Sequence, residues 1–301
     1  MKPDQNNLPR NLLALALCLP FGLANAQSGD DDDDSDLSGK LLLTGGVSQV
    51  EGSAGGGLTP WAVIGGYGTR DQIGGNAYFT RVDVSDYSLD SYGVLVGLYD
   101  RVELSFSRQE FDTQAIGGAL GLGNGFTFTQ DTIGVKVKVA GDAVLEQDSW
   151  LPQISVGAQY KKNDQPGVLA FVGARDDSGV DYYVSATKLY LDKSLLLNTT
   201  VRLTKANQFG ILGFGGDRNN DYEAQLEGSF AYLLSRNVAI GGEYRMKPDN
   251  LGIAEENDAW DVFVAWAPVK NVSLTLAYVD LGNIVIADDQ RGVYASLQVG
   301  F

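Results

Sequence analysis

Ionisable side chains recur at alternate positions in segments whose other positions are apolar. In the segment 195–204, Arg202 is in phase with Asn198 and Thr200, while leucine and valine occupy most positions between them. Alternate side chains of a β-strand point to the same face of a sheet, so such charges are expected on a polar face. Residues of this kind are Glu103, Lys136, Lys138, Lys161, Arg202, Glu223, Glu227, Glu243, Arg245 and Asp261.

Charges of both signs on one strand face have two uses. In a barrel that face is the lumen, so the charges can line a water-filled path. They can also pair with one another and fill the space between the strands. The mixture of signs predicts no strong ion preference. We expect the ten residues to line a lumen, and the sequence leaves open whether that lumen is a path or a braced interior.

Several kinds of chemistry are excluded by composition. The chain has no histidine, so acid–base catalysis by histidine and histidine-ligated metals are excluded. The only cysteine is Cys18, inside the first 26 residues, which leaves no disulfide framework. A net charge of −16 would repel nucleic acid. We predict a protein that is not an enzyme and has no catalytic residue, no metal and no cofactor.

Two motifs resemble ligand loops without meeting their requirements. The glycine-rich run 117–125 lacks the Lys-Ser/Thr ending of a phosphate-binding loop. Asp217, Asn219 and Asp221 are spaced like the start of a calcium loop. However, Tyr222 stands where the sharp-turn glycine belongs, and Gly228 replaces the final glutamate. Flexible polar loops explain both motifs better than binding sites do.

The N-terminal 39 residues divide into two parts. Residues 1–26 have a positive start, an apolar stretch and the cleavage motif Ala24-Asn25-Ala26, which predicts a cleaved signal peptide. Residues 27–39 contain five consecutive aspartates and no apolar face. They are expected to form a disordered acidic leader in the periplasm, with calcium binding or chaperone recognition as the functional alternatives.

From residue 40 onward the apolar period is two. Most of the expected strands run for 10 to 13 residues, whereas strands of soluble sheets usually have about 5 or 6. A tilted strand of about 9 to 11 residues crosses a bilayer. This length favours an all-β fold, a transmembrane antiparallel up-and-down barrel over residues 40–301, rather than a soluble periplasmic sandwich.

We favour 14 strands, with 12 as the alternative if the glycine-rich part before residue 87 is broken or folded inward. A change of phase between Phe128 and Ile133 also predicts a β-bulge. The expected strands are 41–50, 58–68, 76–84, 87–99, 101–112, 124–140, 150–162, 180–192, 194–206, 221–234, 237–247, 258–268, 271–282 and 290–301.

Short and long connections alternate along the chain. Tight turns are expected near Asp100, Asp192, Arg236 and Val269, and longer stretches lie between them. Short turns on the periplasmic side and long loops on the outer side are typical of bacterial outer-membrane barrels. The longer stretches are 112–124, 163–179, 206–221, 247–257 and 282–290.

Aromatic residues and the end of the chain support a membrane location. Trp150, Trp260 and Trp266 lie near expected strand ends, as residues of two interfacial girdles would. The last strand ends in a terminal aromatic preceded by apolar residues at alternate positions. This pattern resembles the signal recognised by the bacterial barrel assembly machinery. Its residues are Val293, Ala295, Leu297, Val299 and Phe301.

Two further stretches carry a family resemblance: GGGLTPWAVIGGYGTRDQIGGNAYFTRVDV at 55–84 and DSYGVLVGLYDRVELSFSRQEFD at 90–112. They resemble a proteobacterial family of exported proteins known as domain of unknown function 3034. The resemblance covers nearly all of the chain after the signal and is densest at 41–112. It implies an outer-membrane location and transfers no binding or catalytic residue.

Together these features predict a barrel in the outer membrane of a Gram-negative bacterium. Its partners would be outer-membrane lipid, the assembly machinery, periplasmic chaperones and, if the lumen is open, small solutes. The predicted function is a passive diffusion channel or transporter for small solutes. The alternative is a plugged, non-conducting barrel with a structural or surface-binding role.

Overall fold

The protein is seen in a computed structural model that describes residues 40–253 and 255–301. The predicted signal peptide and the acidic leader lie outside the described residues. No helix in the described ranges is long and apolar enough to cross a membrane.

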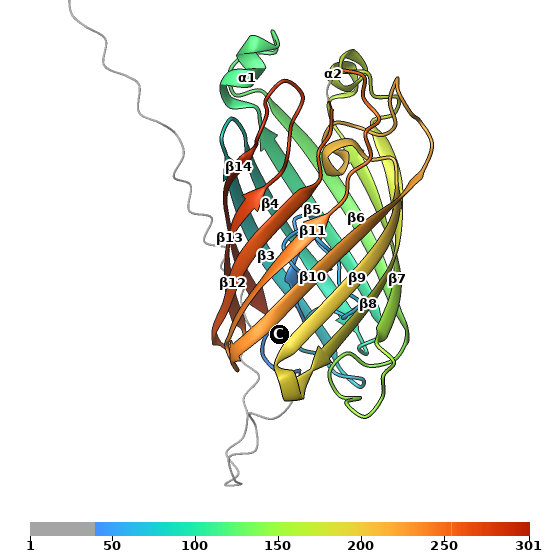
Figure 1. Cartoon of the computed structure of the whole chain (residues 1–301), viewed down its shortest axis with the longest axis vertical. Helices are drawn as coiled ribbons and strands as arrows, with labels where there is room; N and C mark the ends of the chain where they lie inside the picture. The colour runs from blue at the N-terminus through green and yellow to red at the C-terminus, as the bar shows by residue number, and fades with distance from the viewer. Residues whose placement is uncertain (1–39, 254) are drawn as a thin grey trace, which may run out of the picture. The chain divides into compact units, whose positions relative to one another are not determined.

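Twelve antiparallel strands, β3 to β14, close into one barrel (Figure 1). The first and last of them, β3 and β14, complete the closure by pairing Asn76 with Gly300 through to Val84 with Gly292. The strands are β3 Ile73–Val84, β4 Ser88–Leu98, β5 Val102–Asp112, β6 Thr127–Ala140, β7 Gln153–Asn163, β8 Ser178–Tyr190, β9 Leu195–Thr204, β10 Glu223–Ser235, β11 Val238–Arg245, β12 Ala259–Val269, β13 Val272–Asp280 and β14 Arg291–Gly300.

The two faces of the wall differ as the period of two requires. On β12, Val262 and Val264 are exposed on the outer face, while the neighbouring Asp261 is buried in the lumen. The outer face is apolar along most of the other strands as well. A closed barrel leaves no strand edge unpaired, and an apolar outer face is the surface that lipid covers. The chain is therefore a transmembrane β-barrel.

The connections separate by length at the two ends. One end carries the turns 99–101, 191–194, 236–237 and 270–271, the longer connection 141–152 and the C-terminus; η1 Leu191–Lys193 lies in one of these turns. The other end carries 85–87, 113–126 with α1 Gln114–Ala119, 164–177 with α2 Pro166–Phe171, 205–222 with η2 Asn207–Gly210, 246–258 and 281–290. By the outer-membrane pattern, the first end is periplasmic and the second extracellular.

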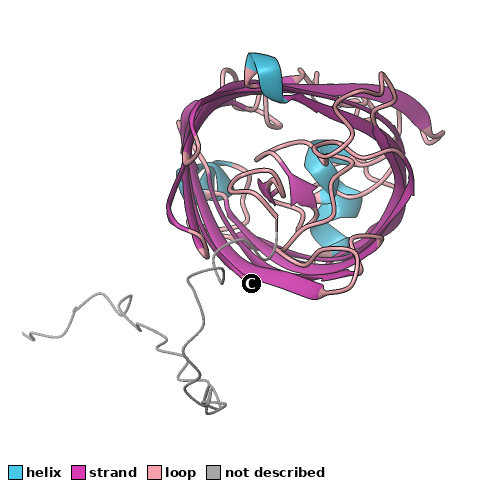
Figure 2. Cartoon of the chain, turned by 90° about the horizontal axis from the view of Figure 1, so that it is seen from below, coloured by secondary structure: helices cyan, strands magenta, loops and turns pink. Residues whose placement is uncertain are grey.

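The strands predicted at 41–50 and 58–68 are wrong, and with them the count of 14. Residues 40–72, here called the plug, lie inside the barrel, where β1 Val47–Ser48 and β2 Ala54–Gly55 form a small ladder (Figure 2). Every residue from Val47 to Gly65 is buried. Inside a barrel the wall covers a segment on all sides, so an apolar alternation there does not indicate a lipid-facing strand.

The predicted bulge between Phe128 and Ile133 is also absent. β5 and β6 pair without a shift from Thr127 to Val137. Phe128 points into the lumen and Ile133 points outward, so both fit one regular strand. The change of phase instead marks a change in the lumen, where Phe128 packs near Phe111 and Tyr87 toward the extracellular end. The register of β6 shifts lower down, between Lys138 and Ala140, where it pairs with β7.

Candidate functional site in the barrel lumen

The centre of the lumen holds a carboxylate of the plug among cations of the wall. Glu51 is fully buried and accepts hydrogen bonds from Arg245, Nη1 to Oε2 at 2.9 Å and Nη2 to Oε1 at 3.1 Å. Lys161 Nζ donates to Glu51 Oε1, and Arg202 Nη2 lies 3.8 Å from Oε2. The plug thus has its one buried acid within reach of three basic side chains of the wall.

Two carboxylates of the wall complete this cluster. Asp181 accepts from Lys161 at 2.6 Å and from Arg202 at 3.4 Å. Glu227 Oε1 accepts from Arg202 Nε at 2.5 Å and lies 3.4 Å from Arg245 Nε. The wall residues come from five successive strands, β7 to β11, so the cluster, here called the central network, forms a continuous belt on one side of the lumen.

The central network decides the ionisation state of Glu51. Burial by itself raises the pKa of the Glu51 carboxyl, because a charge loses its hydration there. The charges of Arg245, Lys161 and Arg202 act in the opposite direction and outweigh burial, so the pKa lies far below its ordinary value. Glu51 is therefore an anion at neutral pH, and this charge binds the plug to the wall.

A second contact between the plug and the wall involves Glu103 and Lys136, which face each other on β5 and β6. Their side chains are 3.1 Å apart and almost fully buried. Lys136 Nζ also donates to the carbonyls of Ala54 and Val63, each at 2.8 Å. Glu103 accepts from the backbone of Ala54 and Gly65. This pair therefore holds the plug mainly through its backbone, and Ser53 Oγ of the plug adds one side-chain hydrogen bond to Glu103 at 2.9 Å.

A third contact places a wall carboxylate against a plug turn. Glu243 accepts from the backbone N–H of Leu58 at 2.8 Å and from Thr59 Oγ1 at 2.6 Å. Gly56 approaches so closely that an added Cβ would lie 2.0 Å from Glu243 Oε1. A side chain at position 56 would displace the Glu243 carboxylate from these hydrogen bonds, which explains one of the three consecutive glycines at 55–57. Asp261 is the cross-strand neighbour of Glu243 on β12.

Both ends of the plug are tied to the periplasmic rim. Lys40 pairs with Asp100 at 2.7 Å, and Arg70 lies 3.7 Å from Asp142. Lys138 pairs with both of these carboxylates. The rim also contains an open cavity of about 590 Å³ whose lining includes Lys40, Arg70, Asp100 and Asp142. The lumen is thus hollow between the plug and the wall at the periplasmic rim and filled at its middle.

The extracellular loop 205–222 closes the lumen from the opposite side. Its residues Asn207 to Gly215 are all buried, and the Phe209 ring lies 4.1 Å from the Arg245 guanidinium. The Phe209 carbonyl accepts from Lys161 at 3.1 Å. Gln208 and Phe209 both have positive φ, of 43° and 62°, a conformation that costs energy in residues other than glycine. The packing around the central network holds this loop inward.

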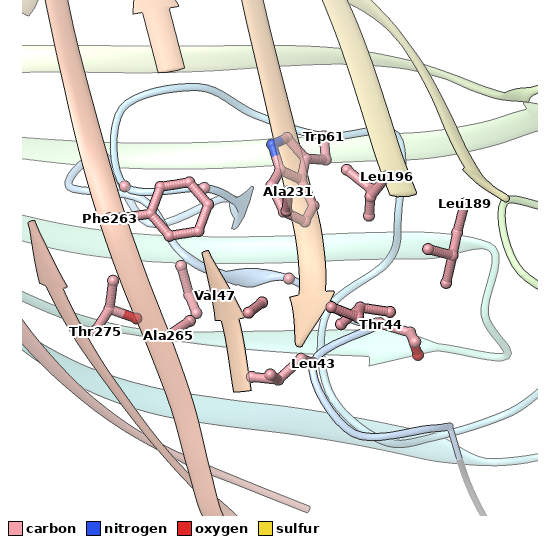
Figure 3. Close-up of a pocket in the computed structure, with 15 residues that line it drawn as sticks. Leu43, Thr44, Val47, Trp61, Leu189, Leu196, Ala231, Phe263, Ala265 and Thr275 are labelled. Carbon is pink, nitrogen blue, oxygen red and sulfur yellow. The ribbon is translucent and has the colours of Figure 1, made fainter. Parts of the chain in front are cut away.

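Apolar side chains fill the lumen on both sides of the polar centre. Toward the periplasm, Trp61 of the plug packs in a pocket with Leu196, Phe263 and Ala265 of the wall (Figure 3). Toward the extracellular end, Val50 and Leu58 of the plug meet Phe209, together with apolar residues of β3, β4, β5 and β13. The charged belt therefore lies between two apolar zones.

The structure places nine of the ten expected lumen residues in the buried interior: Glu103, Lys136, Lys138, Lys161, Arg202, Glu227, Glu243, Arg245 and Asp261. Glu223 is half-buried at the extracellular end of β10, where it accepts a hydrogen bond from Asn219. Arg202, Glu227, Arg245 and Lys161 meet in the central network. Glu103, Lys136 and Glu243 form separate contacts with the plug, and Asp261 lies beside Glu243. Lys138 lies at the periplasmic rim.

The aromatic and terminal residues lie mostly on the outer face. Trp260 and Trp266 point outward near opposite ends of β12, and Trp150 is exposed in the connection 141–152. Of the terminal set, Val293, Leu297, Val299 and Phe301 are exposed and Ala295 is half-buried on the same face. The Phe301 carbonyl also accepts from Tyr67 at 2.9 Å, which joins the end of the chain to the plug.

Sequence reasoning missed Glu51 and Asp181 of the central network. Glu51 follows a segment expected to be a strand, and it became central only because that segment turns inward. A single acid ahead of the glycine-rich run 52–57 is a weak signal by itself. Asp181 shares its strand face with Tyr183 and Ser185, so the period of two would have identified it as a lumen residue.

Residues 44–298 match the family described as "Protein of unknown function (DUF3034)". The chain belongs to this family. The match contains the plug residues around Glu51 as well as most of the barrel, so both are parts of the family's common sequence region. The comparison with curated proteins finds no match.

Solved structures of outer-membrane barrels are similar at low identity. A structure titled "KdgM porin" is 11% identical with a TM-score of 0.48, and the alignment covers 75% of this chain and 99% of that one. Omp33 of Acinetobacter baumannii is 6% identical with a TM-score of 0.45, covering 77% and 100%. Outer membrane phospholipase A of Escherichia coli is 12% identical with a TM-score of 0.41, covering 78% and 94%.

Proposed function

We propose that this protein is a gated channel of the Gram-negative outer membrane for small solutes, closed by the plug and by loop 205–222. The path would be lined by the ten charged residues expected from the sequence, together with Asp181. Opening would require the plug to move away from the central network. The absence of histidine supports a transport role over an enzymatic one.

The polar character of the contact between plug and wall carries this proposal. Lys161, Arg202 and Glu227 are almost fully buried. Replacing a buried ion pair with well-packed apolar residues is often neutral or stabilising by about 1–4 kcal/mol. A permanent plug would be at least as stable with an apolar contact. A wall that becomes hydrated whenever the plug leaves needs polar groups, and this wall has them.

A reversible lock between plug and wall tests the proposal. Thr59 Oγ1 of the plug lies 2.5 Å from Ser229 Oγ of β10, so cysteines at both positions are placed to form a disulfide. Residues 27–301 contain no other cysteine. In planar bilayers we expect conducting steps from the reduced Thr59→Cys/Ser229→Cys protein and none after oxidation.

The control is a disulfide within the wall alone. Thr80 Oγ1 and Ser296 Oγ, on β3 and β14, are 2.8 Å apart, and cysteines there would join two wall strands and leave the plug free. Oxidation of Thr80→Cys/Ser296→Cys should leave the conductance unchanged. A folded protein that conducts in neither redox state would contradict the channel proposal and favour a plugged barrel with a structural or surface-binding role.

Assembly partners are the remaining part of the proposal. The outward alternation that ends at Phe301 supports recognition by the barrel assembly machinery, after delivery by periplasmic chaperones. Deletion of Phe301 should lower the amount of folded barrel in the outer membrane, measured by heat-modifiable gel migration. Phe301→Tyr, which retains a terminal aromatic ring, serves as the matched control.

A further inference from the structure

The two Nη atoms of Arg245 are directed entirely at the plug. They hold the two oxygens of Glu51 in a forked arrangement, and Nη1 also donates to the Leu58 carbonyl at 2.9 Å. The remaining contact of Arg245 with a wall carboxylate is Nε with Glu227, at 3.4 Å. A guanidinium that meets both oxygens of a carboxylate is a geometry proteins use to recognise that group.

The charges of the central network balance only while the plug is in place. Its cations Lys161, Arg202 and Arg245 all belong to the wall, as do the acids Asp181 and Glu227. Glu51 alone comes from the plug. When it leaves, the wall keeps three cations and two acids, and the fork of Arg245 loses its partner. An anion of the same shape would restore both the charge balance and the hydrogen bonds.

The surroundings of the fork suit an organic anion better than a bare ion. The Phe209 ring lies against Arg245, and the Tyr183 ring lies 5.4 Å from the Arg202 guanidinium. Apolar side chains, including Val279 of β13 and Leu281 of the connection 281–290, line the adjoining space together with Phe209. A carboxylate with a small apolar body would therefore find donors for its head and ring or alkyl surface for its body.

We propose that Lys161, Arg202 and Arg245 form a binding site for small organic carboxylates, and that Glu51 occupies this site as an internal substitute in the closed state. The inference rests on the proposed function, since solute reaches the site only after the plug moves. It identifies the solute class as organic anions and explains how a solute would favour the open state, by replacing Glu51.

Chemical rescue of a Glu51→Ala protein tests the site without any current. The substitution leaves a cavity beside three cations, so the melting temperature of the refolded barrel should fall. Added sodium acetate should restore much of this loss in a saturable way. Sodium chloride at equal ionic strength and acetamide, which has the same shape without the charge, should not.

Two further variants make the rescue specific. Glu243→Ala also removes a carboxylate between wall and plug, but its described partners are hydroxyl and amide groups rather than cations, so acetate should not rescue it. Glu51→Ala with Arg245→Met should lose the rescue. If Glu51→Ala does not refold alone, refolding yield with and without acetate becomes the measurement.

The outcomes separate the two proposals. Equal stabilisation of Glu51→Ala by acetate and chloride, or no stabilisation by either, would overturn the carboxylate site. Failure of the disulfide-locked protein to change its conductance would instead overturn the gate. Rescue without conductance would leave the carboxylate site standing in a barrel that does not open.

Discussion

Glu51 is a single residue on which the closure of the lumen depends. A lone carboxylate transferred from water into a protein interior is unfavourable by several kcal/mol unless charges and hydrogen bonds compensate. Here Lys161, Arg202 and Arg245 provide that compensation, and all three lie on a different part of the chain. The interaction therefore stabilises the contact between plug and wall and contributes little to the stability of either part by itself.

The stability contributed by Glu51 should depend on pH in one direction. Burial opposes ionisation but the three cations prevail, so the pKa of Glu51 in the folded protein lies below its ordinary value of 4.5. Its contribution is therefore fully present above that value and is lost as the pH falls through the lower, folded-state pKa. We expect the difference in unfolding free energy between the native protein and Glu51→Gln to be constant from about pH 8 to about pH 5 and to shrink below that range.

Chemical denaturation of both proteins across this pH range provides the measurement. Glu223→Gln, which changes a half-buried carboxylate outside the central network, serves as the control. A difference that already declines between neutral pH and pH 5 would show that Glu51 is not held as an anion, contrary to the prediction.

Removal of the Lys136 charge alone should lower the free energy of unfolding more than its removal together with the charge of Glu103. Lys136→Met leaves the Glu103 carboxylate buried without its cation, and loss of one member of a buried pair costs about 3–5 kcal/mol. With Glu103→Gln added, the uncompensated charge disappears. We expect the double variant to lose about 1–3 kcal/mol less unfolding free energy than the sum of the losses of the two single variants. Guanidinium unfolding of the four proteins provides the measurement. Additive effects would contradict the pairing.

At the level of elements, the sequence predicted the barrel wall well and the plug poorly. Strands β3 to β14 all coincide with expected strands, because lipid outside and polar groups inside impose a regular period of two. The segments 41–50 and 58–68 have a similar alternation for a different reason. They are surrounded by the wall, and local periodicity contains no information about which surface covers a residue. The glycines of this part are the reason for the alternative of 12 strands with an inward fold, and the structure confirms that alternative. They permit the close approach of Gly56 to Glu243.

The same reasoning explains which site residues were predictable. Lys161, Arg202 and Arg245 follow from the polar face of regular strands. Glu51 and Phe209 depend on a plug and a loop that enter the lumen from opposite ends, and such long-range placement leaves no repeating pattern. The sequence therefore indicated the cations of the central network without the anion that they hold.

Fluorescence of the two tryptophans of strand β12 should show where the two membrane interfaces lie along the barrel. Trp260 and Trp266 point outward near its two ends, whereas Trp61 is buried in the lumen. In single-tryptophan variants reconstituted with lipids brominated near the headgroup, fluorescence at positions 260 and 266 should be strongly quenched. Trp61 should be quenched little, because the wall separates it from lipid. Strong quenching of Trp61 would contradict an interior plug.

On the scale of the whole molecule, two segments close the lumen by meeting at its centre. The plug precedes the first strand, and loop 205–222 joins β9 to β10. They touch where the Phe209 carbonyl and Glu51 share Lys161 as a donor. Movement of either segment removes a partner of the same lysine, so the two closures are coupled. The loop and the two ends of the plug lie at opposite ends of the barrel, so they are expected on opposite sides of the membrane.

That orientation can be tested with two residues of nearly equal exposure at opposite ends of the barrel. Phe171, in α2 of the connection 164–177, is 73% exposed, and Leu145, in the connection 141–152, is 74% exposed. Because the chain after residue 26 contains no cysteine, Phe171→Cys and Leu145→Cys each introduce one defined thiol. In intact cells a membrane-impermeant maleimide should label position 171 and leave position 145 unlabelled, while both react after the outer membrane is permeabilised.

The reverse pattern would place the long loops in the periplasm, and the plug would then enter the lumen from the cell exterior. Labelling of both in intact cells would show that the reagent passes through the barrel, and a series of larger maleimides would then measure the width of the path.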